Sequence, residues 1–144
     1  MKVLIHAYPK RMWYVEEFII PSLLEQGLPA EDIEVWNDTE GKGNLQSCME
    51  SFGAREGDGG TWHIQDDVIL CRDFVERCRL LDRDNIVMYG FACERFHDGL
   101  DQRGLVYQPS SWHSFQFVRI PDAYARECAD WCFSDASERF IFSG

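Results

Sequence analysis

The feature that most constrains the fold is an alternation of strand and helix patterns in the first part of the chain. Residues 2–8, KVLIHAY, are mostly apolar and rich in β-favouring side chains, as expected of a buried strand. Residues 12–27, MWYVEEFIIPSLLEQG, then place four apolar side chains on one helical face: Met12, Val15, Ile19 and Leu23. This alternation predicts an α/β fold, a three-layer sandwich in which helices cover a mostly parallel, mixed sheet.

The same pattern repeats twice more. A strand over 32–38, DIEVWND, leads through a glycine-rich turn to a helix that Asn44 is expected to cap. A third strand over 61–64, TWHI, leads to a helix over 73–81. Right-handed crossovers join units of this kind, so we predict that the first three strands are parallel. Pro21 is expected to kink the first helix or to divide it into two pieces.

The later part of the chain predicts two more strands and one more helix. One strand begins at Ile86, another covers 114–121, and Pro121 is expected in the first position of the last helix. These later strands are expected to pair in mixed directions. No internal repeat, low-complexity segment or linker interrupts the pattern, so we predict one domain over residues 1–144.

Charge and cysteine content limit the partners and the compartment. The 144 residues carry a net charge of −11 and offer no basic face for a phosphate backbone, which argues against nucleic acid as the main partner. The sequence contains no run of about 18 apolar residues, so it predicts no transmembrane segment, and the N-terminus does not resemble a signal peptide. We therefore expect a cytoplasmic protein whose six cysteines are reduced and mostly buried.

Two adjacent carboxylates, Asp66 and Asp67, follow the third strand in TWHIQDDVIL. Neighbouring carboxylates repel each other, so a site that holds both needs a cation or abundant water. In an open α/β sheet, ligands bind beyond the carboxyl ends of the strands, where these residues are expected to meet Tyr8 and Asp38. Paired carboxylates there can hold Mg²⁺ or Mn²⁺. The alternative is a pair of solvated turn or helix-capping residues.

The order of these elements resembles the nucleotide-sugar-binding half of GT-A glycosyltransferases, which have a Rossmann-like fold. The resemblance is carried by EVWND, by the glycine-rich turn and by WHIQDDVIL followed by CRDF. That family has a DxD or equivalent carboxylate motif at a strand end, and here the motif has the form Gln65-Asp66-Asp67. The resemblance covers residues 2–81 and implies that 82–144 form the acceptor side.

The resemblance implies a metal-dependent glycosyltransferase. Such an enzyme moves a sugar from a nucleoside-diphosphate sugar donor to a hydroxyl acceptor, with Mn²⁺ or Mg²⁺ as the cofactor. Asp67 would ligate the cation, and Asp66 would contact the ribose or the metal's water shell. His113 and His97 are candidates for a third metal ligand or for acceptor contacts, although single histidines are more often capped or surface residues.

The same resemblance implies roles around the nucleotide. Asp38 would face the base, and Tyr8 would stack on it or flank it. Arg11 would reach a phosphate, and Asn44 opens a helix whose N-terminus favours anions. Ordinary strand-end packing for Tyr8 and a solvated surface position for Arg11 are the alternatives.

The acceptor side is expected within residues 82–144. Glu94 or Asp98, which follow a predicted strand, would activate the acceptor hydroxyl as the base. The loop over 109–115, PSSWHSF, has the aromatic content of a sugar platform, although Trp112 could equally be a core residue.

Other functions remain open at this level. A nucleotidyltransferase would use the same carboxylates on a nucleoside triphosphate, but GKG at 41–43 gives it little support. A non-catalytic domain that binds a nucleotide sugar, or an acidic interaction domain, would need no base. The length of the chain is compatible with a compact enzyme, with a fragment whose acceptor side is incomplete, and with a binding relative.

Overall fold

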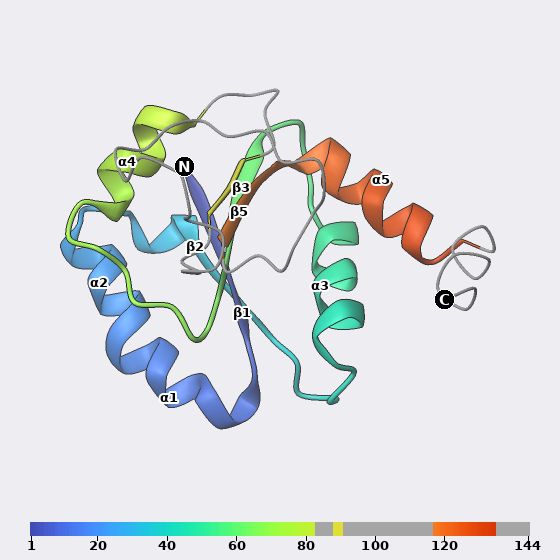
Figure 1. The fold of residues 1–144 in the computed structure, drawn as a ribbon, viewed down its shortest axis with the longest axis horizontal. Coiled ribbons are helices and arrows are strands. Elements are labelled where there is room, and N and C mark those ends of the chain that lie inside the picture. Colours follow the sequence, from blue (N-terminus) through green and yellow to red (C-terminus); the bar gives the residue numbers. More distant parts are fainter. Residues whose placement is uncertain (83–87, 91–116, 135–144) are drawn as a thin grey trace, which may run out of the picture.

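Five strands form one sheet in the order β2-β1-β3-β5-β4 (Figure 1). The structure is a computed structural model, and it describes residues 1–82, 88–90 and 117–134. In chain order the strands are β1 (Lys2–Ala7), β2 (Ile33–Asn37), β3 (Gly60–Gln65), β4 (Met88–Gly90) and β5 (Phe117–Pro121). The sheet therefore places the first strand between the second and the third.

The pairing of the strands confirms a mixed and mostly parallel sheet. β1 is parallel to both β2 and β3, with Val3 opposite Ile33 on one side and Trp62 on the other. β5 is antiparallel to β3 and to β4, so it alone runs against the other four. The prediction that the first three strands are parallel is therefore confirmed, as is mixed pairing of the later ones.

One long helical rod follows β1 and changes its winding along its length. It consists of a 3-10 turn η1 (Pro9–Arg11), α1 (Met12–Tyr14), a π-helical segment η2 (Val15–Ile19) and α2 (Ile20–Glu25). Pro21 lies in the first turn of α2, directly after the π segment. Because proline has no N–H and crowds the preceding turn, the change of winding at this point has a clear cause. The helical winding nevertheless continues without a break from Met12 to Glu25, so Pro21 does not divide this helix into two pieces.

This rod and α4 (Phe74–Leu81) cover one face of the sheet (Figure 1). The alternating side chains Val3, Ile5 and Ala7 of β1 point to this face, together with Trp62 and Ile64 of β3. They pack against apolar residues of the helices: Val15, Ile19, Leu23, Phe74, Val75 and Cys78. Leu28 completes the cluster after the rod ends at Gly27.

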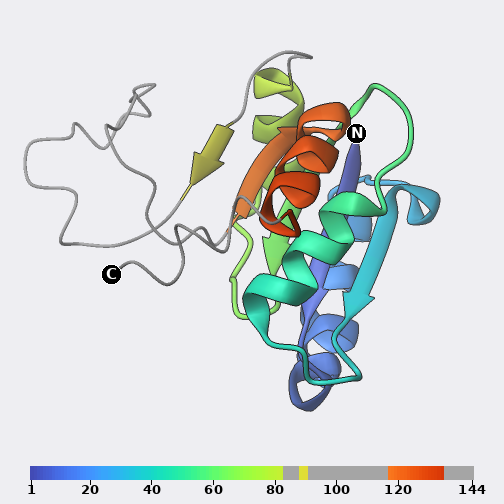
Figure 2. The same ribbon diagram turned by 90° about the vertical axis from the view of Figure 1, so that its right-hand side faces the viewer.

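The opposite face is covered by α3 (Asn44–Gly53) and α5 (Asp122–Cys132), which lie side by side in Figures 1 and 2. Phe52 of α3 and Ala125 of α5 pack with Val118 and Ile120 of β5. Helices on both faces of a sheet give three layers, as predicted.

Several predicted element boundaries are wrong by one or two residues. Asn44 is the first residue of α3 and not its cap, because Gly43 with φ of +88° holds the cap position. Pro121 ends β5 and precedes α5, where its extended backbone turns the chain, instead of opening the helix. β2 is shorter than its predicted range at both ends, and β3 extends one residue further at each end.

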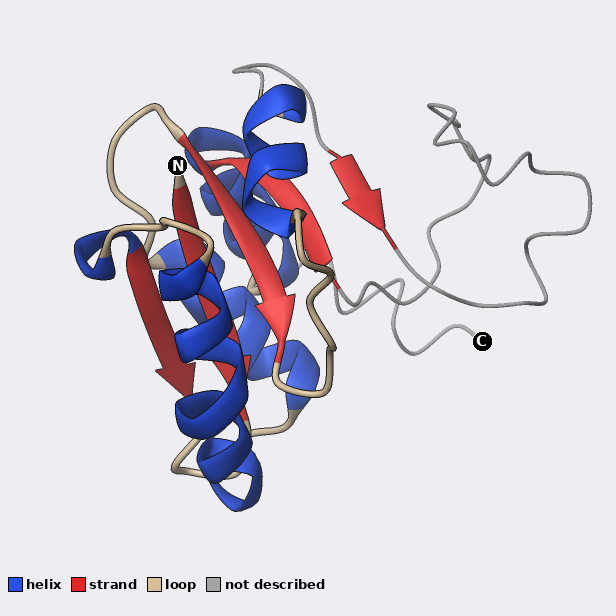
Figure 3. Cartoon of the chain, turned by 90° about the vertical axis from the view of Figure 1, so that its left-hand side faces the viewer, coloured by secondary structure: helices blue, strands red, loops and turns tan. Residues whose placement is uncertain are grey.

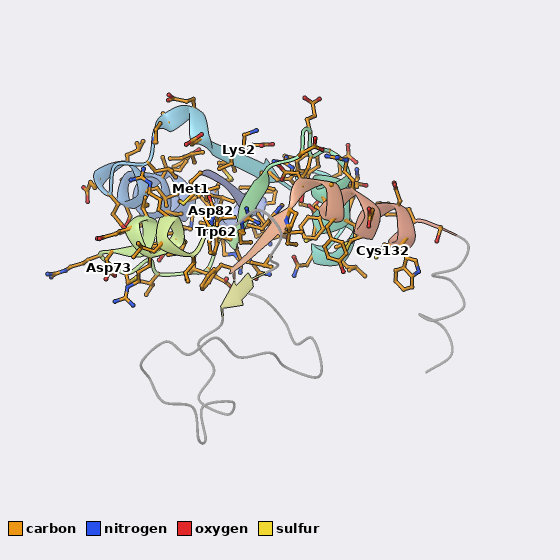
Figure 4. All side chains as sticks on the ribbon, turned by 90° about the horizontal axis from the view of Figure 1, so that it is seen from above. Met1, Lys2, Trp62, Asp73, Asp82 and Cys132 are labelled. Atoms are coloured by element: carbon orange, nitrogen blue, oxygen red, sulfur yellow. The ribbon has the colours of Figure 1, made fainter. Side chains whose placement is uncertain are left out.

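A buried arginine links the sheet to the end of α4. Arg119 of β5 is 1% exposed, and its Nε donates to the Asp82 carboxylate over 2.7 Å. Its guanidinium also lies against the backbone of Gly60, where a Cβ atom would overlap it. Trp62, the register partner of Arg119, and Asp82 are labelled in Figure 4. Glycine is therefore required at position 60 by the close approach of this side chain.

The cysteine prediction is confirmed in part. The five cysteines in the described ranges are free thiols, and Cys48 and Cys78 are buried. Cys71 is exposed because it precedes α4 instead of lying on it, and Cys128 and Cys132 are half-buried on α5. Among the helices that the structure describes, none is long and apolar enough to cross a membrane.

Candidate functional site

A pocket of about 340 Å³ lies where β1 and β3 end, beside the loop that leads from β2 into α3. The parallel strands run towards this edge in Figure 3, where loops connect them to the helices. The pocket is lined by His6, Ala7, Tyr8, Arg11, Asp38, Gly41, Gly43, Asn44, Ser47, Gln65 and Asp66. Five of these were predicted as nucleotide-sugar-binding residues: Tyr8, Arg11, Asp38, Asn44 and Asp66. They come from four separate segments of the chain, and the parallel sheet brings them together.

The two carboxylates of the acidic pair have different environments. Asp66 is 2% exposed, and its two oxygens accept hydrogen bonds from the Tyr8 backbone N–H over 2.6 Å and from Arg11 Nη2 over 2.7 Å. Asp67, the next residue, is exposed and does not line the pocket. Arg11 thus balances the charge of Asp66, whereas the charge of Asp67 is solvated by water.

Arg11 is the cation of the pocket wall. It ends the 3-10 turn that follows β1, and its backbone N–H donates to the Tyr8 carbonyl over 2.8 Å. Its hydrogen bond to Asp66 raises the pKa of the guanidinium, and the nearby charge of Asp67 acts in the same direction. Half of its side chain is exposed, so it is neither an isolated surface cation nor a buried one. Tyr8 is also exposed, at 43%, which argues against ordinary strand-end packing.

Asp38 organises the loop on the other side of the pocket. Its Oδ1 accepts the backbone N–H of Lys42 and its Oδ2 accepts that of Gly43, each over 2.9 Å. Gly43 is the cap of α3, and no side chain caps that end of the helix. The backbone N–H groups of the first turn, beginning at Asn44, are therefore left for water or for a ligand. A helix end of this kind favours an anion.

Two histidines lie at the floor of the pocket: half-buried His6, which lines it, and buried His63, which contacts His6. His6 of β1 and His63 of β3 share a hydrogen bond between Nε2 and Nδ1 over 3.0 Å, and Phe52 packs edge-on against both rings. Burial lowers the pKa of His6 to about 4, with Arg55 as the next cause, and burial lowers the pKa of His63 well below its usual value. Both rings are therefore neutral near pH 7.

Sequence reasoning missed this histidine pair. His6 and His63 interrupt apolar strands, and each occupies a position that alternates with core residues facing the other side. That alternation was available as a signal. It does not reveal, however, that β1 and β3 are neighbours in a register that brings the two rings together.

A divalent cation fits the acidic pair only through Asp67. Within residues 1–82 and 117–134, no three metal-ligating side chains gather in one place, and both Asp66 oxygens already accept hydrogen bonds. Mg²⁺ is commonly held by one or two carboxylates together with substrate phosphates and water, so a single exposed carboxylate is compatible with such an ion. The other predicted ligand, His113, lies outside the described residues.

The predicted acceptor side cannot be placed in the same way. Glu94, Asp98 and His97 lie outside the described residues, as does the loop over 109–115. Their roles stay predictions from the sequence.

Comparison with known proteins does not assign a family to this chain. No family model, no curated protein and no solved structure matches it. A function therefore has to be inferred from the site itself, and from the sequence motifs that meet there.

Proposed function

We propose that this protein is a glycosyltransferase of the GT-A type that binds its nucleoside-diphosphate sugar in the pocket beyond β1 and β3. The observation that carries the proposal is the convergence of Tyr8, Arg11, Asp38, Asn44 and Asp66 on this one pocket. Its volume of about 340 Å³ is at the lower end of the range of small-molecule sites. Its position also follows the rule for ligands of open α/β sheets.

The phosphates of the donor would lie between Arg11 and the start of α3. A guanidinium donates several N–H groups in a plane and suits phosphate oxygens, and the uncapped first turn of α3 adds backbone donors. The half-exposed ring of Tyr8 is placed to flank the base at the end of β1. Asp38, whose oxygens hold the loop before α3, would act mainly by shaping this wall.

Asp67 would hold Mn²⁺ or Mg²⁺ together with donor phosphate oxygens and water. When bound, the ion would neutralise negative charge that develops on the departing nucleoside diphosphate. In the transfer itself, the acceptor oxygen forms a bond to the anomeric carbon as the bond to the diphosphate oxygen breaks. We propose that the carboxylate of Glu94 or Asp98 takes the acceptor proton.

Nucleotidyl transfer is less well supported by the same site. It would require a cation such as Lys42 of the GKG turn to reach a triphosphate. The Nζ of Lys42 instead lies 2.8 Å from Glu40 and 2.9 Å from Glu50, so its charge is already paired. The remaining alternative is a protein that binds the nucleotide sugar without transferring it.

Binding and turnover measurements test the proposal in two steps. Calorimetric titration with UDP, GDP, CDP and ADP, each with and without Mn²⁺, should show saturable binding of at least one nucleotide that Mn²⁺ strengthens. The matching sugar donors should then release free nucleoside diphosphate slowly in water and faster with a hydroxyl acceptor. Binding without any release would indicate the non-catalytic alternative, and no binding in any titration would contradict the proposed function.

A further inference from the structure

We infer that Asp66 is a positioning residue, which acts by holding Arg11 and the Tyr8 backbone in place for the phosphates of the ligand, and that it is not a ligand of the metal. This inference rests on the proposed function, because it concerns how the same pocket recognises a diphosphate. The two residues of the acidic pair then have different roles: Asp66 binds Arg11, and Asp67 binds the metal.

The first step is the state of the Asp66 carboxylate. Each oxygen accepts one hydrogen bond, from Tyr8 N–H over 2.6 Å and from Arg11 Nη2 over 2.7 Å, and the side chain is 2% exposed. A divalent cation on the oxygen that faces Arg11 would lie beside the guanidinium, and the two positive charges would repel each other. A metal at that oxygen would therefore have to compete with Arg11.

The second step is the position of the two partners. Tyr8 and Arg11 belong to the turn that follows β1, whereas Asp66 follows β3, so the carboxylate joins two neighbouring strand ends across the pocket wall. With one hydrogen bond to each partner, Asp66 fixes both the backbone and the side chain of that turn.

The third step is what Arg11 can still do. A guanidinium has five N–H donors, and the bond to Asp66 leaves the others for a ligand. An arginine already held in one conformation loses less side-chain entropy when it binds phosphate. Asp66 therefore strengthens phosphate binding without contacting the phosphate, and its effect depends on the presence of Arg11.

A double-mutant cycle on UDP binding tests this dependence, with and without Mn²⁺. Asp66→Asn should weaken UDP binding about tenfold in the wild-type background and less than twofold in the Arg11→Ala background. The loss should be the same factor with Mn²⁺ and with EDTA, and the affinity for uridine, which lacks phosphates, should not change. The asparagine variant is expected to fold, because the amide oxygen can still accept the Tyr8 N–H.

The Asp73–Arg77 pair provides a matched control. It joins an aspartate to an arginine over 2.7 Å, but both side chains are exposed and neither lines the pocket. Asp73→Asn and Arg77→Ala should leave UDP affinity unchanged. If Asp66→Asn does not fold, Arg11→Ala alone still tests the inference, because it should reduce UDP affinity by a similar factor with and without Mn²⁺.

Three results would overturn the inference, and they are distinguishable. If the Asp66→Asn loss persists in full in the Arg11→Ala background and vanishes with EDTA, Asp66 is a metal ligand and only this inference fails. If Arg11→Ala binds UDP as the wild type does, Arg11 does not contribute to phosphate binding, and again only this inference fails. If the wild-type protein binds no nucleoside diphosphate under any condition, both the proposed function and this inference fail.

Discussion

At the scale of single residues, two adjacent aspartates have different environments and therefore different expected roles. Asp66 and Asp67 are adjacent in the chain, yet one is buried against Arg11 and the other is exposed. The sequence predicted that this pair needs a cation. It could not predict that the cation is an arginine 55 residues away, because that contact depends on the pairing of β1 with β3.

Asp67→Ala should abolish the Mn²⁺-dependent part of UDP binding and leave the fold intact. The side chain is exposed, so its loss should change the free energy of unfolding by no more than about 0.5 kcal/mol. Calorimetric titration and thermal melting of both proteins measure the two effects. Asp58→Ala, which removes another fully exposed carboxylate far from the pocket, is the control for the change in net charge. Equal Mn²⁺ dependence in wild type and Asp67→Ala would contradict the metal role.

The histidine pair should make the protein less stable as the pH falls below about 6.5. The folded-state pKa of both His6 and His63 is lower than the unfolded value, so the unfolded chain binds more protons in this range. His6 then removes up to about 1.4 kcal/mol of stability per pH unit, down to about pH 4, and His63 acts in the same direction.

Urea unfolding at pH 7.0, 6.0 and 5.0 measures this effect. His63→Leu removes one of the two titrating rings and should reduce the dependence on pH by about half, even if it lowers stability at pH 7. A variant with the wild-type pH dependence would show that other groups cause it.

At the scale of elements, periodicity predicted which segments are helices and strands but not how they end. The apolar spacing of residues 12–23 and 45–52 is sufficient to identify α1, α2 and α3. The cap of α3 depends instead on Gly43 at positive φ and on an Asp38 carboxylate five residues earlier. Such local hydrogen bonds are not visible in a hydrophobic pattern.

Asp38→Ala should loosen the loop before α3 and weaken UDP binding as a consequence. The variant loses the acceptor of the Lys42 and Gly43 N–H groups, and the loss of such hydrogen bonds should cost about 1 kcal/mol of stability. Asp38→Asn keeps one acceptor oxygen. Its stability and its affinity for UDP should therefore lie between those of Asp38→Ala and those of the wild type. If Asp38 contacts the base directly, the two variants should also change selectivity among UDP, CDP and GDP.

Gly60→Ala tests the contact between β3 and the buried arginine of β5. The new Cβ would overlap the buried Arg119 guanidinium and force it to move relative to Asp82, so the melting temperature should fall. Gly53→Ala is the matched control, because its Cβ would meet only Ala129 at 3.5 Å, an ordinary contact, and alanine favours a helix. The control should keep or raise the melting temperature. Equal melting temperatures for both variants would show that Arg119 adjusts without cost.

At the scale of the whole molecule, the parallel arrangement of β1, β2 and β3 is what makes a site from distant residues. Their carboxyl ends meet at one edge, where Tyr8, Arg11, Asp38 and Asp66 gather around a single pocket. This part of the site was predictable because topology follows from alternating strands and helices. The floor formed by the histidine pair was not predictable, because it requires the register and the facing of each strand.

A second cavity at the opposite edge of the sheet offers an internal comparison. It has a volume of about 250 Å³ and is lined by residues near the starts of β1 and β3 and of α5, among them Lys2, Thr61 and Asp122. It mixes cations and carboxylates, but none of the residues predicted from the sequence to bind a nucleotide lines it. The nucleotide is therefore assigned to the first pocket only.

Amide chemical-shift mapping during a titration with UDP and Mg²⁺ measures the location of the ligand directly. The largest shifts are expected at Tyr8, Arg11, Gly43 and Asn44, and all four should saturate at the same ligand concentration. Amides that line the second cavity, such as that of Thr61, should not move. Shifts confined to the second cavity, or no saturable shift at the first pocket with any nucleoside diphosphate, would contradict the assignment of the nucleotide to the first pocket.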